Sequence, residues 1–314
     1  MLKFFLSIFL IPLLLFGQEP KEIQVGSFNI EWFPCKDDGE MMKKYDINLR
    51  RPPEGNATNI EALFGVLKEL DIELLGVVEI VDPVLLAESA KKYLGPQFEF
   101  IYAPSASSQK IGFLYDSSVL ELVGQAEIYT EVMLDPHSWL RPAFRGYFKA
   151  IPSGMDFHAI VTHLKAAPSG WGKRERQWNV LYNILKELPG ESGDKDVVLM
   201  GDFNNVSKLR ENEFVPLIDS LGYYWVTSEL AAQGKFSNYW KPDYSIERIE
   251  GSLIDHLFIS GDAKQEYVMN STRTGGMCAD GESEYLGENI PDYNEMISDH
   301  CPVFLTLRVD KDND

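Results

Sequence analysis

The chain has 314 residues, 45% of them hydrophobic and 25% charged, which is an ordinary globular composition, so we expect disorder only at the ends. Its 48 acidic residues outnumber 29 basic ones and give a formal net charge of −19. This charge argues against a protein that coats nucleic acid through a basic surface. It does not exclude an enzyme that acts on phosphates, because bound divalent cations can invert the local charge.

The N-terminal segment differs from the rest of the chain. Lys3 precedes an apolar run from Phe4 to Phe16, and Gly17 follows it. The run is shorter than the roughly 20 residues that cross a bilayer. It is typical of a signal peptide over residues 1–17, with an uncleaved anchor or a buried helix as the alternative. We therefore predict export, to the periplasm or out of the cell, with no membrane span left after cleavage.

Strand and helix patterns alternate from residue 22 onward. Apolar runs predict strands at 23–33, 73–80, 98–103, 110–116, 119–129, 141–151, 156–164, 196–203, 251–260 and 302–309. Helical spacing predicts helices at 56–70, 83–94 and 172–188, the first of them capped by Asn56 or Thr58. Residues 36–56 and 271–296 are predicted to be long loops.

The order of these elements, without an internal repeat or a linker, predicts one α/β domain over residues 22–310 and an acidic tail at 311–314. Two sheets packed face to face, with helices outside, would bury the apolar runs. We expect a four-layer β-sandwich and a monomer.

Polar residues recur where the predicted strands begin or end. If these strand ends gather on one rim of the sandwich, they line a cleft with carboxylates, amides and imidazoles. Taken singly, each also fits a turn or a strand cap. The residues concerned are Asn29, Glu31, Glu79, His163, Asp202, Asn204, Asp255, His256, Asp299 and His300.

The ordered set FNIEW, VVEI, VTHLKA, LMGDFNN, LIDHLF and ISDHCPV resembles the endonuclease/exonuclease/phosphatase superfamily. That superfamily includes deoxyribonuclease I, abasic-site endonucleases, neutral sphingomyelinases and inositol-polyphosphate phosphatases. The resemblance covers residues 22 to 310, and GDFN and SDHCPV are its most specific parts. It implies a deoxyribonuclease I-like sandwich with the site at one rim, and hydrolysis of phosphodiester bonds by attack of water.

The resemblance also implies roles for single residues. Glu79 corresponds to the main metal ligand, Asn29 stands beside it, and Asp299 is a further metal or water contact. Oxygen ligands of this kind suit Mg²⁺, or alternatively Mn²⁺ or Ca²⁺. His300 corresponds to the general acid or base, and Asp255 to the carboxylate that orients it.

Four further positions concern the substrate phosphate and a second histidine. Asp202 and Asn204 correspond to a pair that contacts phosphate and water, and Arg141 to a phosphate-contacting arginine. His163 corresponds to the second histidine of deoxyribonuclease-like members. Gln109 stands where those members place a glutamate beside this histidine, so His163 would be oriented by an amide and lack a charged partner.

The resemblance leaves the substrate open. We expect a secreted nuclease acting on DNA or RNA, and the basic run 173–176 with Trp171, Gln177 and Trp178 could contact its backbone and bases. Solvated first turns of a helix explain that run equally well. The alternative is a phosphodiesterase or phosphatase acting on phospholipid, like a sphingomyelinase, or on small phosphorylated molecules.

An exposed aromatic hairpin would favour the lipid substrate, whereas the aromatic run 221–230 is more typical of a core. A catalytically silent binding protein would be favoured by loss of Glu79 or His300, and both are present.

Three cysteines, Cys35, Cys278 and Cys301, leave at least one unpaired. After export Cys35 and Cys278 could pair, and Cys301 is expected to be a small buried residue.

Overall fold

A computed structural model of the chain describes residues 22–34, 57–105, 107–136, 138–205 and 218–310, together with 312. The expected signal peptide, Cys35, the predicted loop 36–56 and most of the acidic tail lie outside the described residues. Within these ranges, no helix combines the length and the apolar character that crossing a membrane requires.

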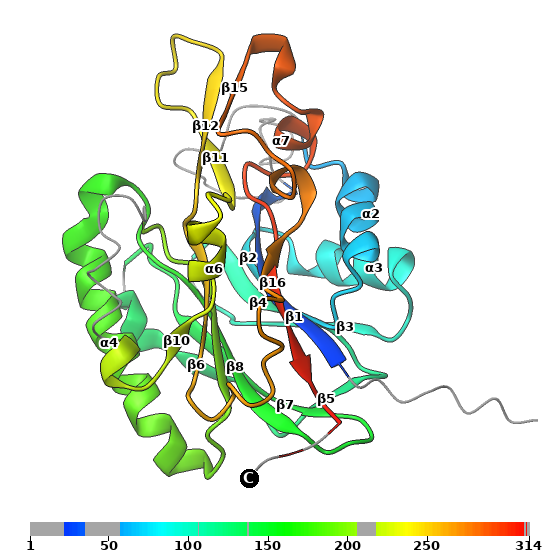
Figure 1. Cartoon of the computed structure of the whole chain (residues 1–314), viewed down its shortest axis with the longest axis vertical. Helices are drawn as coiled ribbons and strands as arrows, with labels where there is room; N and C mark the ends of the chain where they lie inside the picture. The colour runs from blue at the N-terminus through cyan, green and yellow to red at the C-terminus, as the bar shows by residue number, and fades with distance from the viewer. Residues whose placement is uncertain are drawn as a thin grey trace, which may run out of the picture.

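The strands form two large sheets that pack face to face (Figure 1). The first sheet runs in the order β14 (Arg273–Thr274), β16 (Val303–Arg308), β1 (Glu22–Phe33), β2 (Leu74–Ile80), β4 (Lys110–Asp116), β3 (Phe98–Tyr102). The second runs in the order β10 (Tyr224–Trp225), β13 (Asp255–Ile259), β9 (Val197–Asp202), β8 (Asp156–His163), β7 (Ala143–Ala150), β5 (Leu120–Leu122), and β6 (Glu127–Tyr129) also pairs with β7.

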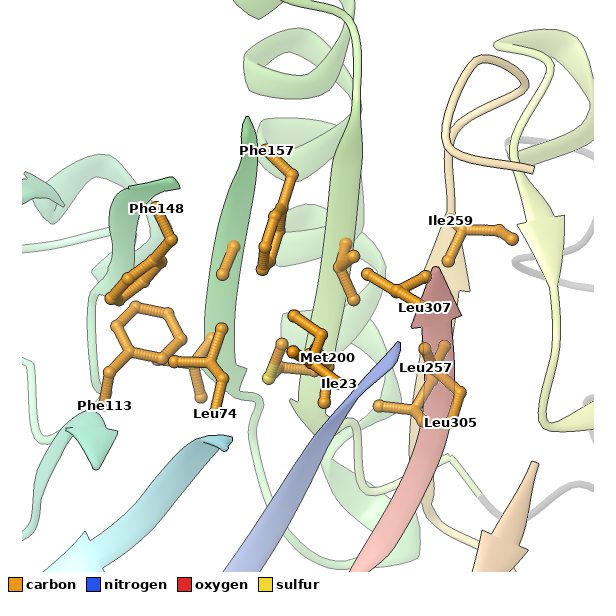
Figure 2. Packing of buried hydrophobic residues seen from close by; sticks show 14 of the residues in the cluster. Ile23, Leu74, Phe113, Phe148, Phe157, Met200, Leu257, Ile259, Leu305 and Leu307 are labelled. Atoms are coloured by element: carbon orange, nitrogen blue, oxygen red, sulfur yellow. The ribbon is translucent and has the colours of Figure 1, made fainter. Parts of the chain in front are cut away.

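The main core lies between these sheets. Figure 2 shows Leu74 and Leu305 of the first sheet facing Phe148, Met200 and Leu257 of the second. All five side chains are almost wholly buried. Alternate residues of each strand point inward, as the apolar runs of the sequence predict.

Helices cover the outer faces of both sheets (Figure 1). The first sheet carries α2 (Ile60–Leu70) and α3 (Pro83–Tyr93), and the second carries α4 (Trp171–Ser192). Helices and sheets thus form the expected four-layer sandwich. The cap of α2 is Asn59, whose Oδ1 accepts from Ala62 N at 3.0 Å, so the predicted cap at Asn56 or Thr58 is wrong.

A smaller sheet projects from one end of the sandwich (Figure 1). This arm consists of β11 (Asn238–Trp240), β12 (Arg248–Ser252) and β15 (Glu284–Leu286). Short helices in the chain around the arm are α6 (Ser228–Ala232), α7 (Asp292–Met296), η3 (Gly276–Cys278) and η4 (Gly287–Asn289). Two more, η1 (Thr130–Met133) and η2 (Pro168–Gly170), lie beside α4.

Three predictions about local structure are wrong. Residues 271–296 are not a plain loop, because they contain β14, η3, β15, η4 and α7. The predicted strand 119–129 breaks at Gly124, whose φ is +72°, into β5 and β6. Cys301 is buried as expected, but it forms a disulfide with Cys278, so the possible Cys35–Cys278 pair is wrong.

Candidate active site

Strand pairing brings the polar strand ends to one rim. Strands β1 and β2 run parallel, as do β8 and β9, so their carboxyl ends share that rim. The register places Asp202 of β9 between two neighbours: His163 on β8 and Asp255 on β13. His300 reaches the same place because it stands just before β16 and bridges to Asn238 of the arm.

Glu79 owes its position to a β-bulge. The register of β2 with both β1 and β4 skips this residue, and its φ is +64°. A bulge re-aims the side chain that it carries. The carboxylate therefore enters the rim, where it lies within 3.3 Å of the Asn29 amide nitrogen.

His300 and Asp255 form a buried hydrogen-bonded pair. Nδ1 of His300 lies 2.8 Å from Oδ2 of Asp255. The same oxygen accepts from Ser237 Oγ at 2.7 Å, while Ser237 Oγ accepts from the backbone N–H of Ile254 and of Asp255 at 3.1 and 3.0 Å. This network fixes the carboxylate, and through it the imidazole, with Nε2 facing the cleft.

The charges around His300 favour its protonated form. Burial acts to lower the pKa of His300, but the carboxylates of Asp255, Asp299 and Asp202 outweigh it and hold this pKa well above its ordinary value. Nε2 lies 3.8 Å from Asp202 Oδ2 and 3.9 Å from Asp299 Oδ1. The imidazolium is thus held among anionic oxygens at the mouth of the site.

Asn29 joins the carboxylates and His300. Its Nδ2 donates to Glu79 Oε1 at 3.3 Å and to Asp202 Oδ2 at 3.0 Å. It also lies 3.3 Å from His300 Nε2, which is a contact between two donors when the imidazole is protonated. Its Oδ1 accepts from Glu31 N at 3.0 Å, which fixes the amide so that the nitrogen faces the site. In this arrangement Asn29 orients the carboxylates and does not offer its oxygen to a cation.

The buried carboxylates fit a divalent cation. Burial and the neighbouring Asp299 raise the pKa of Glu79, while burial and Asp255 raise that of Asp202 to about 7. Clustered anions of this kind are stabilised by a bound cation. Donor atoms of Glu79, His163 and Asp202 lie within 4.8 Å of one another, so the residues present match the expected cation.

His163 is buried beside the same carboxylates. Its Nε2 lies 3.4 Å from Asp202 Oδ2 and 3.6 Å from Glu79 Oε1. Its Nδ1 has no hydrogen-bond partner among the described residues, so the expected pairing with the Gln109 amide is wrong. Burial, together with Arg141, lowers the pKa of His163 well below its ordinary value, so the neutral imidazole is favoured.

Arg141 and Asn204 both hold the chain that leaves β8. Arg141 Nη2 donates to Leu164 O at 3.2 Å, and Asn204 Nδ2 donates to the same oxygen at 3.3 Å. Asn204 N also donates to Asp202 Oδ1 at 2.8 Å. Asn204 lines the cleft, whereas Arg141 is buried behind it, so the structure does not place Arg141 at the substrate phosphate.

Asp299 is tied to the rim by its backbone. Its N–H donates to Glu31 Oε2 at 2.9 Å, and Ser298 Oγ donates to Asn29 O at 2.8 Å. The side chain of Asp299 is left half-buried and facing the cleft. The serine and the aspartate of the SDH motif therefore fasten the start of β16 to the end of β1.

These residues surround a cleft of about 390 Å³. Its floor carries the acids, amides and imidazoles described above. One side is the stretch 166–168 after β8, and another is formed by the arm and the chain that enters β13. The cleft-lining residues are Glu79, His163, Ala166, Ala167, Pro168, Asp202, Asn204, Asn238, Trp240, Ser252, Ile254, Asp299 and His300.

The sequence missed two of the residues that shape this site. Ser237, which holds Asp255, stands just before β11. Trp240, which lines the cleft, ends β11, and no strand periodicity marks either residue. The run FSNYW was the available signal, since a serine and a tryptophan border a short strand there.

Three residues of the basic run 173–176 and its neighbours are structural. Arg174 is buried and donates to Lys165 O at 2.6 Å and Ala167 O at 2.7 Å. Gln177 is buried and accepts from Lys165 N, while Trp178 stacks on Phe203 in the core. The expectation that these side chains contact nucleic acid is therefore wrong for Arg174, Gln177 and Trp178.

The comparisons agree with this architecture. The model of the endonuclease/exonuclease/phosphatase family matches residues 26–300. None of the curated proteins matches the chain significantly. Among solved structures, a family protein from Bacteroides thetaiotaomicron is 17% identical with a TM-score of 0.59, covering 92% of this chain and 98% of that chain.

Two further structures have informative descriptions. A mannosyl-6-phosphatase of Bacteroides thetaiotaomicron is 16% identical with a TM-score of 0.57, covering 90% of this chain and 98% of its own. The D. rerio TDP2 complexed with a single-strand DNA product is 14% identical with a TM-score of 0.61, covering 91% and 99%. At these identities the likeness concerns the fold.

Proposed function

The chain belongs to the endonuclease/exonuclease/phosphatase family and is a hydrolase of phosphoester bonds, and we propose that it cleaves phosphodiester bonds of nucleic acid with a divalent cation. Mg²⁺ is the first choice for the cation, ahead of Mn²⁺ and Ca²⁺, because the floor of the cleft is rich in carboxylate oxygens. Glu79 and Asp202, with Asp299 nearby, would hold it.

One observation carries the proposal: the His300–Asp255 pair and the Glu79–Asp202 carboxylates open into one cleft. Hydrolysis needs a proton donor or acceptor close to the phosphate, and it needs positive charge where the phosphoryl oxygens gain electron density. His300 Nε2 supplies the first. The bound cation would supply the second by neutralising charge on those oxygens.

Each residue of the site then has its own role in the hydrolysis. An oxygen of water bonds to phosphorus, the ester P–O bond breaks, one proton leaves the water and one reaches the departing oxygen. His300, protonated and hydrogen-bonded through Nδ1 to Asp255, is placed to give the proton or to stabilise the anionic phosphate. Asp202 accepts from the water, and Asn204 donates to a phosphate oxygen. Asp255 keeps the His300 tautomer and compensates its charge.

The disulfide supports export. Disulfides form and persist in oxidising compartments and are rare in the reducing cytosol. The Cys278–Cys301 bond is buried and joins η3 to the residue next to His300. Together with the apolar run at 4–16, it favours a secreted or periplasmic enzyme.

A lipid phosphodiester is the second candidate substrate, and the arm favours it. The chain between β11 and β12 carries Tyr244 and Ile246, whose side chains are 91% and 51% exposed. An exposed tyrosine and isoleucine can enter the surface of a bilayer, although the same hairpin tip carries the charged Lys241 and Asp243. Sphingomyelin or a related phospholipid would then reach the cleft from the membrane.

Cleavage assays decide between these substrates. Mature protein is incubated with duplex DNA, single-stranded DNA and RNA, with Mg²⁺ or with a chelator, and acid-soluble nucleotides are measured. We expect cation-dependent release that His300→Ala reduces at least about 100-fold. His158→Asn, which removes a buried imidazole at the opposite end of β8, serves as the matched control and should keep activity.

The thermal midpoint of each variant verifies folding. Folded, cation-loaded protein that cleaves no polynucleotide would overturn the nuclease proposal. Sphingomyelin vesicles and hexose 6-phosphates, tested with the same preparation, would then identify the lipid or small-molecule alternative.

A further inference from the structure

We propose that the cleft holds an extended single strand in a two-part subsite, in which Trp240 stacks on a base next to the scissile phosphate and Lys165 and Lys173 hold backbone phosphates beyond it. The inference rests on the proposed nucleic acid substrate. It specifies where the strand lies and which residues contact its bases and its backbone.

Trp240 is positioned where it can contact a ligand in the cleft. It lines the cleft, yet its side chain is 47% exposed. Burying a tryptophan contributes to stability, and an exposed one beside an active site is therefore a candidate contact. Base–aromatic stacking contributes to binding whatever the base, because every base has a π-face.

The polar side chains near Trp240 already have hydrogen-bond partners within the protein. Ser252 Oγ donates to Asn238 Oδ1 at 3.0 Å, and Asn238 Nδ2 donates to Asp299 O at 3.3 Å. Ile254 adds an apolar side chain to the wall of the cleft that Trp240, Asn238 and Ser252 form. The wall thus offers a ring face and alkyl groups and few hydrogen bonds, which suits a planar base better than the hydroxyl groups of a sugar.

Two lysines stand next to the other side of the cleft, outside its lining, and Lys165 Nζ donates to Ala166 O at 2.9 Å. Lys165 immediately precedes the cleft-lining stretch 166–168, and Lys173 stands in the first turn of α4 just after it. Charges acting on Lys165 come from Arg141, Lys173 and Arg174, all of them cations. Among the described residues neither lysine forms an ion pair with a carboxylate, in a chain whose net charge is −19.

The backbone of this side is held rigidly. The guanidinium of Arg174 donates to the carbonyl oxygens of Lys165, just before the stretch, and of Ala167 within it. No acidic residue occupies the first turn of α4, so nothing there offsets the charge of Lys173. Cations near a stacking ring are the combination with which proteins bind single strands without reading their sequence.

Binding of a modified oligonucleotide tests the subsite separately from catalysis. The probe is a 12-nucleotide phosphorothioate DNA strand that contains 2-aminopurine, whose fluorescence falls when the base stacks. We expect quenching by the wild-type protein, and weaker affinity by about 5- to 50-fold together with lost quenching in Trp240→Ala. Trp240→Phe should restore both in part, which a merely structural role would not do.

The lysine side is tested with charge reversal. Lys173→Glu should weaken binding at least about 5-fold in 50 mM salt, and the difference should shrink in 500 mM salt. Lys186→Glu is the matched control, because it lies on the same helix about 20 Å farther along. Tyr244→Ala is the control for Trp240, because Tyr244 is exposed on the arm outside the cleft.

Each outcome has one meaning. Wild-type affinity and quenching in Trp240→Ala, or equal effects of the two lysine reversals, would overturn the subsite. Cleavage of the unmodified strand is measured in parallel: binding with quenching but no cleavage would refute the nuclease proposal and leave the subsite standing. Cleavage that neither Trp240→Ala nor Lys173→Glu alters would refute the subsite and leave the nuclease proposal standing.

Discussion

Replacing Asp255 by asparagine separates the charge of this residue from its hydrogen bonds. Oδ2 accepts from His300 Nδ1 and Ser237 Oγ, whereas Oδ1 has no partner among the described residues. An amide satisfies both donors only if its oxygen takes the place of Oδ2, which leaves its NH₂ group at the position of Oδ1. We therefore expect Asp255→Asn to keep the His300 tautomer and to lose the negative charge.

The size of the effect follows from that geometry. A hydrogen bond to a charged group contributes about 1–2 kcal/mol more than a neutral one, which corresponds to roughly a 5- to 30-fold lower kcat/KM. Asp255→Ala also removes the orientation of the imidazole, and a loss of about 10²- to 10⁴-fold is expected. The pKa of His300 should fall in both variants, because Asp255 raises it.

The assay compares kcat/KM of both variants with wild type between pH 5 and pH 9, on bis(4-nitrophenyl) phosphate and on DNA. The pH limb that reports His300 should move to lower pH. Nitrogen chemical shifts of the imidazole check the tautomer, and thermal midpoints correct for lost folding. Equal losses in Asp255→Asn and Asp255→Ala, or wild-type rates in both, would refute this reading of the pair.

Three further changes test the stability of the fold. Burial raises the pKa of Glu73 to about 7, so stability is lost as the pH rises from about 4.5 to about 7, and Glu73→Gln should gain in Tm relative to wild type across that range. Gly201 has a φ of +142° and a Cβ there would strike Thr162 O, so Gly201→Ala should cost roughly 2–4 kcal/mol in urea unfolding. Gly65→Ala is its control, because a Cβ there meets nothing, and it should stabilise α2 by about 0.5–1 kcal/mol. Cys278→Ser should cost about 3 kcal/mol, measured the same way under oxidising conditions, because the bridge closes a 23-residue separation.

The sequence could predict the rim because the pairing of regular strands determines where their ends lie. Apolar alternation sets the strands, and parallel pairing of β1 with β2 and of β8 with β9 places their carboxyl ends together. Polar residues that end such strands must then meet, as His163 and Asp202 do, whereas Glu79 reaches the rim through its β-bulge. The closeness of Asp255 and His300, 2.8 Å apart, was likewise expected from the motifs that carry them.

What the sequence could not predict lies in irregular chain. The Cys278–Cys301 bridge joins a short η3 turn to the start of β16, and no spacing rule identifies such a pair. Ser237 finds Asp255 only because the arm folds back over β13. The prediction that the basic run contacts nucleic acid fails for a similar reason. A count of charges does not reveal that the Arg174 guanidinium donates to two backbone carbonyls.

Backbone strain at the rim links the core to the chemistry. Glu31, Glu79 and Asn204 have φ values of +42°, +64° and +51°, a region that non-glycine residues rarely adopt. Each such residue costs on the order of 1 kcal/mol or more, and glycine would remove that cost. Each carries a polar side chain that contacts the site or lines its cleft, so the strain persists where these groups are needed. The rigid strands behind them, locked by the core between the two sheets, hold these conformations and fix the carboxylates and amides around His300.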